Sequence, residues 1–385
     1  MMNSNSYIDY AYISFNKYDE ELCGDTVSIN DDGTNITIVL ADGMGSGVKA
    51  SILSTLTANI LNTMLKNNID IEESVETLID TLPVNNDNGV AYSTFSIVNM
   101  SRDGKGVLYE FDNPKYIYMR DNNIQILNEE EFDVYGKRIT KAIINLKDND
   151  YILLMSDGVP YAGAGSTLNY GFSRDNIIEY LKQRVNNDMS SKQIATVLAR
   201  ACVDLYMQKP YDDTSVVVIK KRKRNSVSIM IGPAKNSDDD EIYVKNFLEN
   251  KDYRIVCGGS TSKVVNRYLN EDIIMSDVES DIPPYGHSSS IQLISEGILT
   301  LKRVNELAKK YLDNKYLEYE NEKKDDAATK ISEVLFEKAS DINFYVGHGI
   351  NLNHVGIIED DKFVIVNELI DSLKKMNKNI NRYDY

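Results

Sequence analysis

The first half of the sequence is a series of short apolar runs separated by Asp, Asn and Gly. Examples are YAYISFN, DTVSIN and NITIVLAD, and similar runs return in residues 91–146. β-Branched and aromatic residues bounded by turn-forming residues are typical of strands, and closely spaced strands of this kind favour antiparallel pairing. Antiparallel sheets are therefore predicted for this half.

Helical periodicity appears between these strands. In residues 46–68, five apolar residues fall four positions apart, namely Val48, Ile52, Leu56, Ile60 and Met64. This spacing predicts a long helix whose apolar face includes these residues and packs against a sheet. Similar patterns predict further helices at 71–82, 174–185 and 191–207. Sheets with flanking helices, rather than a regular βαβ alternation, indicate an α+β unit.

The second half has a different rhythm, because its strands alternate with helices. VSIMIGP, YRIVCGG and DINFYVGHG are predicted strands, and helical tracts lie between them. Such alternation is typical of an α/β domain with a largely parallel sheet. The basic run KKRKR at 220–224 separates the halves and is interpreted as a solvated strand end and linker rather than as a basic recognition patch. Two domains are therefore predicted, 1–222 and 223–385.

Composition narrows the class of protein. The 385 residues carry a net charge of −17, and a surface that acidic repels nucleic-acid backbones. The three cysteines, Cys23, Cys202 and Cys257, show no CxxC spacing, which argues against a disulfide framework or a structural zinc site. The sequence begins without a signal-like segment, and no window approaches about 18 apolar residues. A cytoplasmic protein that neither binds nucleic acid nor spans a membrane is expected.

Acidic residues stand at the ends of several predicted strands. They are Asp25 before TVSIN, Asp42 after ITIVLA, Asp157 after YILLMS, and Asp212 and Asp213 before TSVVVIK. Any one of them is typical of a turn, but strand ends rarely collect several acids without a cation to hold. A glycine follows Asp42 and Asp157 directly, so the next carbonyl can approach a cation. Oxygen-rich sites of this kind suit Mg²⁺ or Mn²⁺.

Four of these segments occur in an order that resembles a known family. They are GD at 24–25, DGMGSG at 42–47, MSDGV at 155–159 and DDTSVVVIK at 212–220. Together they resemble the metal-dependent protein phosphatases (the PPM, type 2C family), and most closely the bacterial branch typified by the sporulation phosphatase SpoIIE. The resemblance covers roughly residues 7–220. It implies an α+β fold, a β-sandwich of two antiparallel sheets flanked by helices, followed here by the smaller α/β domain.

The resemblance also implies the residues of a centre of two Mn²⁺ or Mg²⁺ ions. Asp42 would bridge the two ions, and the Gly43 carbonyl would complete the coordination of one of them. Asp25 would serve one ion, and Asp157 and Asp212 would serve the other. The catalytic residues implied in this way are Asp42, Asp157 and Asp212.

Three points of the resemblance stay open. The tandem of Asp212 and Asp213 leaves the metal ligand ambiguous by one residue. Ser96 stands where the SpoIIE-like branch usually has an acid, two residues after the threonine of a core strand. Moreover, no obvious arginine lies beside the first motif to hold the substrate phosphate, so that role is unassigned.

A cytoplasmic protein serine/threonine phosphatase is the function that the resemblance implies. Water activated by the two ions would hydrolyse phosphoserine or phosphothreonine on a regulatory protein, such as an anti-sigma-factor antagonist in sporulation or stress signalling. No protein nucleophile is needed, in agreement with a sequence that holds three histidines. The resemblance also allows a homodimer.

The second domain carries another candidate site, in CGGSTS at 257–262. Its residues Gly258, Gly259, Ser260 and Thr261 lie between a predicted strand and a predicted helix, where amides and hydroxyls offer a cradle for a phosphate-bearing small ligand. Alternatively, the glycines only turn the chain, and Ser260 or Thr261 caps the helix. The alternative function is thus a non-catalytic signalling scaffold whose second domain, regulatory under the first hypothesis, binds such a ligand.

Overall fold

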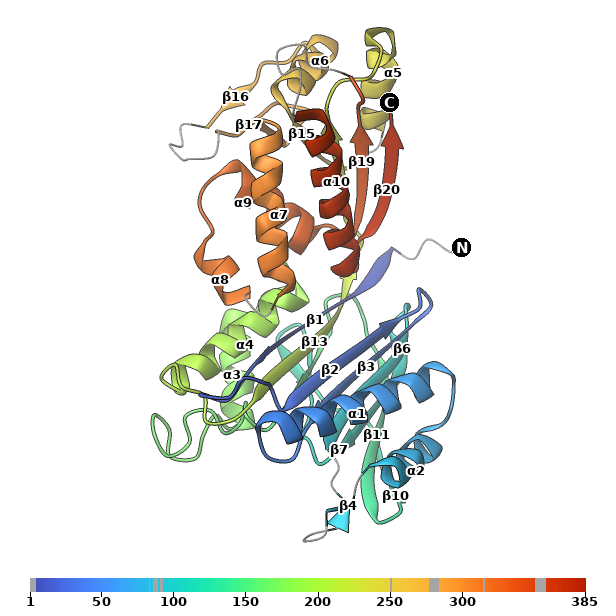
Figure 1. Cartoon of the computed structure of the whole chain (residues 1–385), viewed down its shortest axis with the longest axis vertical. Coiled ribbons are helices and arrows are strands. Elements are labelled where there is room, and N and C mark those ends of the chain that lie inside the picture. Colours follow the sequence, from blue (N-terminus) through green and yellow to red (C-terminus); the bar gives the residue numbers. More distant parts are fainter. Residues whose placement is uncertain are drawn as a thin grey trace. The chain divides into compact units, whose positions relative to one another are not determined.

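The chain forms two compact units, Met1–Lys223 and Arg224–Tyr385, in a computed structural model (Figure 1). The boundary lies one residue from the one expected from the sequence. The structure describes residues 5–82, 84–85, 89–90, 93–249, 251–276, 284–313, 316–349 and 358–385. No helix in these ranges is long and apolar enough to cross a membrane.

The first unit contains two antiparallel sheets, as predicted. The five-stranded sheet has the order β1 (Ser6–Phe15), β13 (Thr214–Lys223), β12 (Tyr151–Met155), β8 (Ile117–Arg120) and β9 (Asn123–Gln125). The six-stranded sheet has the order β10 (Glu129–Val134), β11 (Lys137–Asn145), β7 (Lys105–Phe111), β6 (Thr94–Ser101), β3 (Asn35–Asp42) and β2 (Asp25–Asp31). A further pair, β4 (Val84–Asn85) and β5 (Gly89–Val90), lies outside both sheets.

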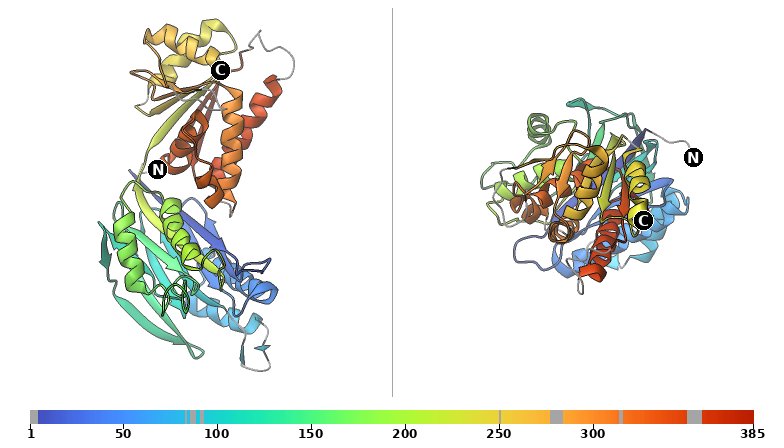
Figure 2. Two further views of the ribbon diagram at one scale, coloured as in Figure 1. Left: turned by 90° about the vertical axis from the view of Figure 1, so that its left-hand side faces the viewer. Right: turned by 90° about the horizontal axis from the view of Figure 1, so that it is seen from above.

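Alternation along the strands places the core between the two sheets. In β3, Ile38 and Leu40 belong to the apolar cluster that also holds Leu154 of β12 and Val217 of β13. Val39, which points the other way, belongs to a second cluster under the helices. The six-stranded sheet is covered by α1 (Gly47–Lys66) and α2 (Ile71–Thr81), and the five-stranded sheet by α3 (Arg174–Arg184) and α4 (Ser191–Leu205) (Figure 2). The predicted sandwich flanked by helices is therefore confirmed.

The buried face of α1 differs from the predicted one. Val48, Ile52 and Leu56 are 61%, 54% and 41% exposed. The face that packs on the sheet instead carries small and polar residues along with two leucines: Ala50, Ser54, Thr57, Ala58, Leu61, Asn62 and Leu65. Small side chains let the helix backbone approach the sheet closely, and the Ser54 hydroxyl lies 2.7 Å from the Thr26 hydroxyl of β2. The apolar pattern located the helix, and Leu61 and Leu65, which flank the predicted stripe, are buried as expected, whereas Val48, Ile52 and Leu56 face away from the sheet.

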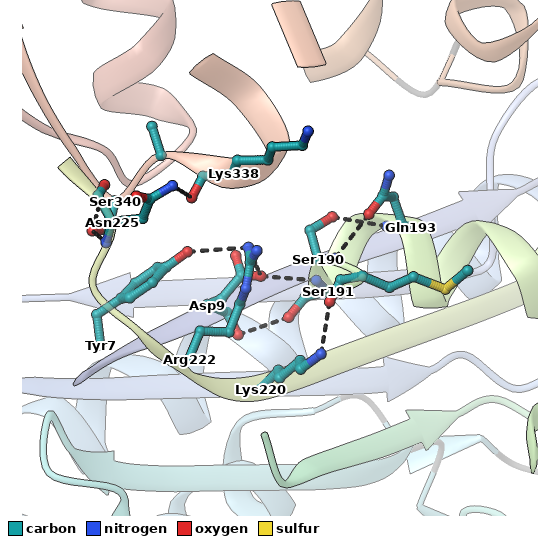
Figure 3. A network of polar contacts seen from close by, with 12 residues as sticks. Tyr7, Asp9, Ser190, Ser191, Gln193, Lys220, Arg222, Asn225, Lys338 and Ser340 are labelled. Carbon is teal, nitrogen blue, oxygen red and sulfur yellow. Dashed lines mark hydrogen bonds and ion pairs between the residues drawn. The ribbon is translucent and has the colours of Figure 1, made fainter. Parts of the chain in front are cut away.

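The basic run at 220–224 is a strand end at the boundary of the units, as predicted, since its first four residues belong to β13, but it is not solvated throughout. Lys220 is 1% exposed, and its ammonium donates to the carbonyls of Asn187 (2.8 Å) and Met189 (2.7 Å). Burial lowers the pKa of Lys220 to about 8. Figure 3 shows the neighbouring contacts, in which Asp9 of β1 accepts from Arg222 and from the Ser191 amide at the start of α4. These basic residues join α4 to the sheet.

A second polar network lies next to Lys220 in the five-stranded sheet, around Asp150 at the start of β12. The Asp150 carboxylate, 1% exposed, accepts hydrogen bonds from the Tyr118 hydroxyl (2.6 Å), the Arg120 guanidinium (2.6 and 2.9 Å) and the Lys147 amide (2.8 Å). A buried carboxylate with this many donors is stabilised only while all of them stay in place.

We expect Asp150→Asn to lower the free energy of unfolding by about 2–3 kcal/mol, because the Arg120 charge would lose its partner. Urea denaturation followed by far-UV circular dichroism measures the change. Glu131→Gln is the matched control, since Glu131 is exposed and its nearest cation, Arg138, is 3.8 Å away. Equal effects of the two substitutions would contradict the expectation.

The second unit is an α/β domain with a largely parallel sheet, as predicted. Its strand order is β16 (Ile274–Met275), β17 (Gly286–His287), β18 (Leu293–Ser295), β15 (Tyr253–Cys257), β14 (Ser226–Ile231), β19 (Asp341–Val346) and β20 (Asn379–Asp384). The strands from β18 to β20 pair in parallel, and β16 and β17 add antiparallel pairs at one edge. The chain therefore winds outward from β14 in both directions.

Helices connect the strands of the second unit. They are α5 (Asp240–Glu249), α6 (Gly259–Leu269), α7 (Ile298–Leu312), α8 (Tyr316–Asn321), α9 (Ala327–Ser332) and α10 (Ile358–Lys375), with a 3₁₀ turn at Ser237–Asp239 and a π-helical turn at Glu333–Lys338. Tyr243 and Phe247 of α5 pack with Met230 and Val256 of the sheet in one apolar cluster.

Candidate metal centre

The hairpin of β2 and β3 places Asp25 directly opposite Asp42. The register runs from Asp31 opposite Ile36 to Asp25 opposite Asp42. The turn is closed by the Asp32 carboxylate, which accepts from the amides of Thr34 (2.8 Å) and Asn35 (2.7 Å). The two candidate ligands therefore owe their proximity to the hydrogen-bonded ladder of one hairpin.

The other two candidate ligands come from the second sheet, at the junction of β12 and β13. Ser156, one residue past β12, donates its amide to the Ser215 carbonyl (3.1 Å), and its hydroxyl accepts from the Ser215 amide (2.8 Å). This clamp keeps Asp157 beside the start of β13. The Asp157 amide in turn lies 3.5 Å from the Asp42 carboxylate. The structure thus brings the ends of the two sheets together at these acids.

The carboxylates raise one another's pKa values. Burial, with further contributions from neighbouring acids, raises the pKa of Asp25 to about 7 and that of Asp42 to about 9. For Asp42 the neighbouring charges are those of Asp25, Asp157 and Asp212. Burial also raises the pKa values of Asp157 and Asp212. Four acids that interact in this way form one electrostatic unit.

Asp25 is the most informative member of the group. Its side chain is buried, and neither oxygen has a hydrogen-bond partner among the described residues. The hydroxyls of Ser156 and Ser215 partly offset the rise in its pKa, but neither makes a hydrogen bond of normal geometry with it. A buried carboxylate without donors costs free energy unless a positive charge compensates it. Oxygen ligands of this kind fit a hard divalent cation.

The acids are neighbours, but their side chains do not already converge on one point. In the described part of the chain, no three His, Cys, Asp or Glu side chains have the arrangement of a metal site.

Gly43 sits where no side chain fits. A Cβ atom at this position would lie 2.1 Å from the Ala50 carbonyl oxygen in the first turn of α1. The Gly43 amide donates to the Gly24 carbonyl at 3.1 Å, which ties the residue after Asp42 to the residue before Asp25. Glycine thus lets the two strand ends and α1 pack together. The role of the Gly43 carbonyl as a ligand stays a prediction.

The structure distinguishes Asp212 from Asp213. Asp213 is buried, and its carboxylate accepts from the Lys17 amide at 3.0 Å, which fixes the segment after β1. Asp212 is partly exposed, accepts from the Asp213 amide at 3.0 Å, and interacts electrostatically with Asp157. Each carboxylate thus accepts one backbone amide, and the second oxygen of Asp213 is buried without a hydrogen-bond partner among the described residues. Which of the two residues is the ligand stays a prediction.

Two features near the acids were not found from the sequence. Ser96 is buried and accepts from the Asn113 amide (3.1 Å), while the Asn113 carbonyl oxygen accepts from the Thr94 hydroxyl (2.5 Å). Thr94 is the cross-strand partner of Asp42. Asn113 therefore supports the strand in which the SpoIIE-like branch usually has an acid and this chain has Ser96. The second feature is Lys17, whose positive charge offsets a small part of the rise in the pKa of Asp212. In the sequence, its position eight residues before Asp25 could have indicated a cation near the first motif.

The candidate ligand residues of the second unit lie at the junction of β15 and α6. Gly258 has a φ of +119°, and the helix begins at Gly259. The Thr261 hydroxyl is buried, accepts from the Gly232 amide (2.9 Å) and donates to the Cys257 carbonyl (3.1 Å). No side chain in the described residues caps α6, since its N-cap is Gly258. The expected cap by Ser260 or Thr261 is therefore absent.

Comparison with solved structures finds chains of similar fold. One is the PP2C phosphatase domain with a fragment of the regulatory domain of the cell fate determinant SpoIIE from Bacillus subtilis, with 20% identity and a TM-score of 0.48; the match covers 57% of this chain and 65% of that one. Another holds the RsbU and RsbW domains of a Mycobacterium tuberculosis protein, with 14% identity and a TM-score of 0.47; it covers 63% and 68%.

Sequence comparison gives the family. Stage II sporulation protein E of Bacillus subtilis (strain 168) is 25% identical over 209 residues, which cover 51% of this chain and 24% of that protein. The chain thus spans about a quarter of the length of this relative. The family model of stage II sporulation protein E (SpoIIE) matches residues 32–222, nearly all of the first unit. Through this unit, the chain belongs to the family of stage II sporulation protein E.

Proposed function

We propose that the first unit is a metal-dependent protein serine/threonine phosphatase. The observation that carries the proposal is Asp25, a buried carboxylate that has no hydrogen-bond donor among the described residues and lies opposite Asp42 at the end of a hairpin. A non-catalytic scaffold would have no physical reason to keep buried acids that repel each other. Membership of the SpoIIE family supports the same function.

The proposed ligands of two Mn²⁺ or Mg²⁺ ions are Asp25, Asp42, the Gly43 carbonyl, Asp157 and Asp212. Such ions, when bound, lower the pKa of water and offset the negative charge of a phosphoryl group. The chain itself holds the acids in place through the β2–β3 ladder and the Ser156–Ser215 clamp. The Asp157 amide orients the Asp42 carboxylate across the two sheets.

In this proposal, Lys17 holds the substrate phosphate, a role to which the sequence alone assigned no residue. Its charge acts on Asp212, and its amide is fixed by Asp213. A lysine ammonium close enough to act on a carboxylate of the cluster can pair with a substrate phosphate once cations have neutralised the acids. The substrate in this proposal is a phosphorylated regulatory protein, such as an anti-sigma-factor antagonist, as family resemblance suggests.

The proposal is tested by hydrolysis of a phosphoserine peptide with and without Mn²⁺. We expect activity that depends on Mn²⁺ and falls about a hundredfold in Asp212→Asn, because a ligand of one ion is lost. Asp213→Asn is the matched neighbour and is expected to act mainly on stability, since its partner is the Lys17 amide. Wild-type protein that binds Mn²⁺ without hydrolysing any phosphopeptide would contradict the proposal. A larger loss of activity in Asp213→Asn would transfer the ligand role to Asp213.

A further inference from the structure

A groove runs along the first unit between α3 and the segment around β9. Its volume is about 500 Å³, and its lining includes Lys115, Tyr116, Ile124, Ile126, Arg174 and Ile178. Ile126 is 90% exposed, whereas Ile178 is buried in the wall formed by α3. The groove is thus an open channel with apolar sides and charged groups along it, unlike the enclosed pockets that hold small ligands.

Most charges in the groove are already paired. The Lys115 ammonium lies 2.7 Å from the Glu129 carboxylate, and the Lys182 ammonium lies 2.7 Å from that of Glu179. Glu129 also accepts from the Tyr116 hydroxyl at 2.8 Å. These pairs neutralise each other, and the charged lining residues that remain are Arg174 and the neighbouring Asp175.

Arg174 is different. One of its terminal nitrogens donates to the Tyr116 carbonyl at 3.0 Å, which holds the guanidinium in the groove. Its Nε atom is buried and so out of reach of a ligand, but its other terminal nitrogen has no hydrogen-bond partner among the described residues. The charge of Arg174 also opposes the rise that burial causes in the pKa values of Glu110 and Glu129. In the same ranges, no carboxylate oxygen lies within salt-bridge distance of it. A guanidinium held by one carbonyl, with further donors unused, is suited to receive a carboxylate from outside.

A short path connects the groove to the candidate metal centre. Asp42 lies opposite Thr94, whose hydroxyl bonds to Asn113, and Lys115 at the groove is two residues further along. Cross-strand spacing, one hydrogen bond and two residues of backbone add up to a path of about 15–20 Å. An extended peptide of about five residues spans that distance.

We propose that this groove binds the protein substrate through a segment about five residues from the phosphoserine, in which an acidic residue pairs with Arg174 and apolar neighbours contact Ile124 and Ile126. The proposal rests on the proposed phosphatase function and adds a substrate preference to it. The whole chain carries a charge of −17, so most of its surface repels an acidic segment. A local guanidinium therefore gives such a segment a place where it can bind.

The test is direct binding of two unphosphorylated peptides, which are not hydrolysed, to the full chain in the presence of Mn²⁺. One carries Asp-Ile-Asp about five residues from a serine on either side, and the other carries Asn-Ile-Asn at the same places. Fluorescence anisotropy is expected to show about tenfold tighter binding of the acidic peptide. Arg174→Gln should abolish this difference, and more salt should reduce it.

Matched variants separate docking from folding. Arg138→Gln removes an exposed arginine outside the groove and should keep the preference for the acidic peptide. Ile126→Ser changes a residue that is 90% exposed, so the fold tolerates it, and it should weaken both peptides alike. Equal affinities of the two peptides for the wild type, or a preference that survives Arg174→Gln, would overturn the proposal. Acid-selective binding without any phosphopeptide hydrolysis would refute the phosphatase function alone.

Discussion

Asp42→Asn is expected to reduce Mn²⁺-dependent hydrolysis of a phosphoserine peptide by at least about a thousandfold, because it removes the ligand that the two ions would share. Asparagine keeps the shape of the side chain and one oxygen but loses the negative charge. The hairpin register with Asp25 and the contact with the Asp157 amide can persist. Steady-state kinetics with saturating Mn²⁺ measure the loss. Asp121→Asn, on an exposed turn, should leave the rate unchanged, and a loss below tenfold in Asp42→Asn would contradict the bridging role.

Without metal, we expect Asp42→Asn to increase the stability of the folded chain, although it lowers the activity. The pKa values of Asp25 and Asp42 are raised in the folded state to about 7 and about 9. The folded chain therefore binds protons that the unfolded chain has already lost, so stability falls as pH rises from about 4 to about 9. In Asp42→Asn this decline should be shallower and the melting temperature higher at neutral pH.

Comparison of the variant with the wild type isolates the Asp42 contribution. Glu110 also titrates abnormally, since burial raises its pKa to about 8, but it is present in both proteins. Thermal melts in chelator at several pH values give the difference, and Mn²⁺ should reverse it, because the ions replace bound protons. Metal-free wild type that becomes more stable relative to the variant as pH rises would show that the acids are not coupled.

Gly43→Ala is expected to destabilise the first unit by about 3 kcal/mol, since the added Cβ would lie 2.1 Å from the Ala50 carbonyl oxygen. The start of α1 or the end of β3 must then move, and the spacing between Asp42 and Asp25 changes with it. Urea denaturation measures the stability, and hydrogen exchange of the 47–66 segment reports whether α1 has loosened. Phosphatase activity should fall together with α1 protection.

Gly45→Ala provides the control two residues further along the same loop. Gly45 has a φ of +94° but nothing within 4 Å of its Cβ position. Only the backbone conformation penalises a side chain there, at about 1 kcal/mol. Equal losses in the two variants would show that loop conformation, rather than contact with α1, decides the stability of this corner.

The relative position of two of the proposed metal ligands was predictable from local sequence. The Asp32-Gly33 turn joins two strands with matching alternation, and its register places Asp25 opposite Asp42. The approach of Asp157 and Asp212 to that hairpin depends instead on two sheets meeting across a core, which no local pattern specifies. It became predictable through the resemblance to a family.

The errors have a physical origin in packing. The apolar spacing of α1 included Val48 and Ile52, yet the sheet beneath it favours a close approach through Ala50 and Ala58. Lys220 was assigned to solvent because of its charge, but its long side chain reaches two carbonyls inside the unit. Similarly, Arg174 is one of many charged residues in the sequence. What sets it apart from the other cations of the groove is that, among the described residues, no carboxylate forms an ion pair with it.

The pairing of β1 with β13 has a consequence for how the first unit assembles. In the described sheet β1 lies at the edge, with Phe15 opposite Thr214 and Ser6 opposite Lys223. During synthesis, β1 emerges first but its partner is the last strand of the unit to be made. Contacts so distant along the chain slow folding and leave an unpaired strand edge exposed in the meantime. At this edge of the sandwich, the strand that is synthesised first is therefore among the last to be paired.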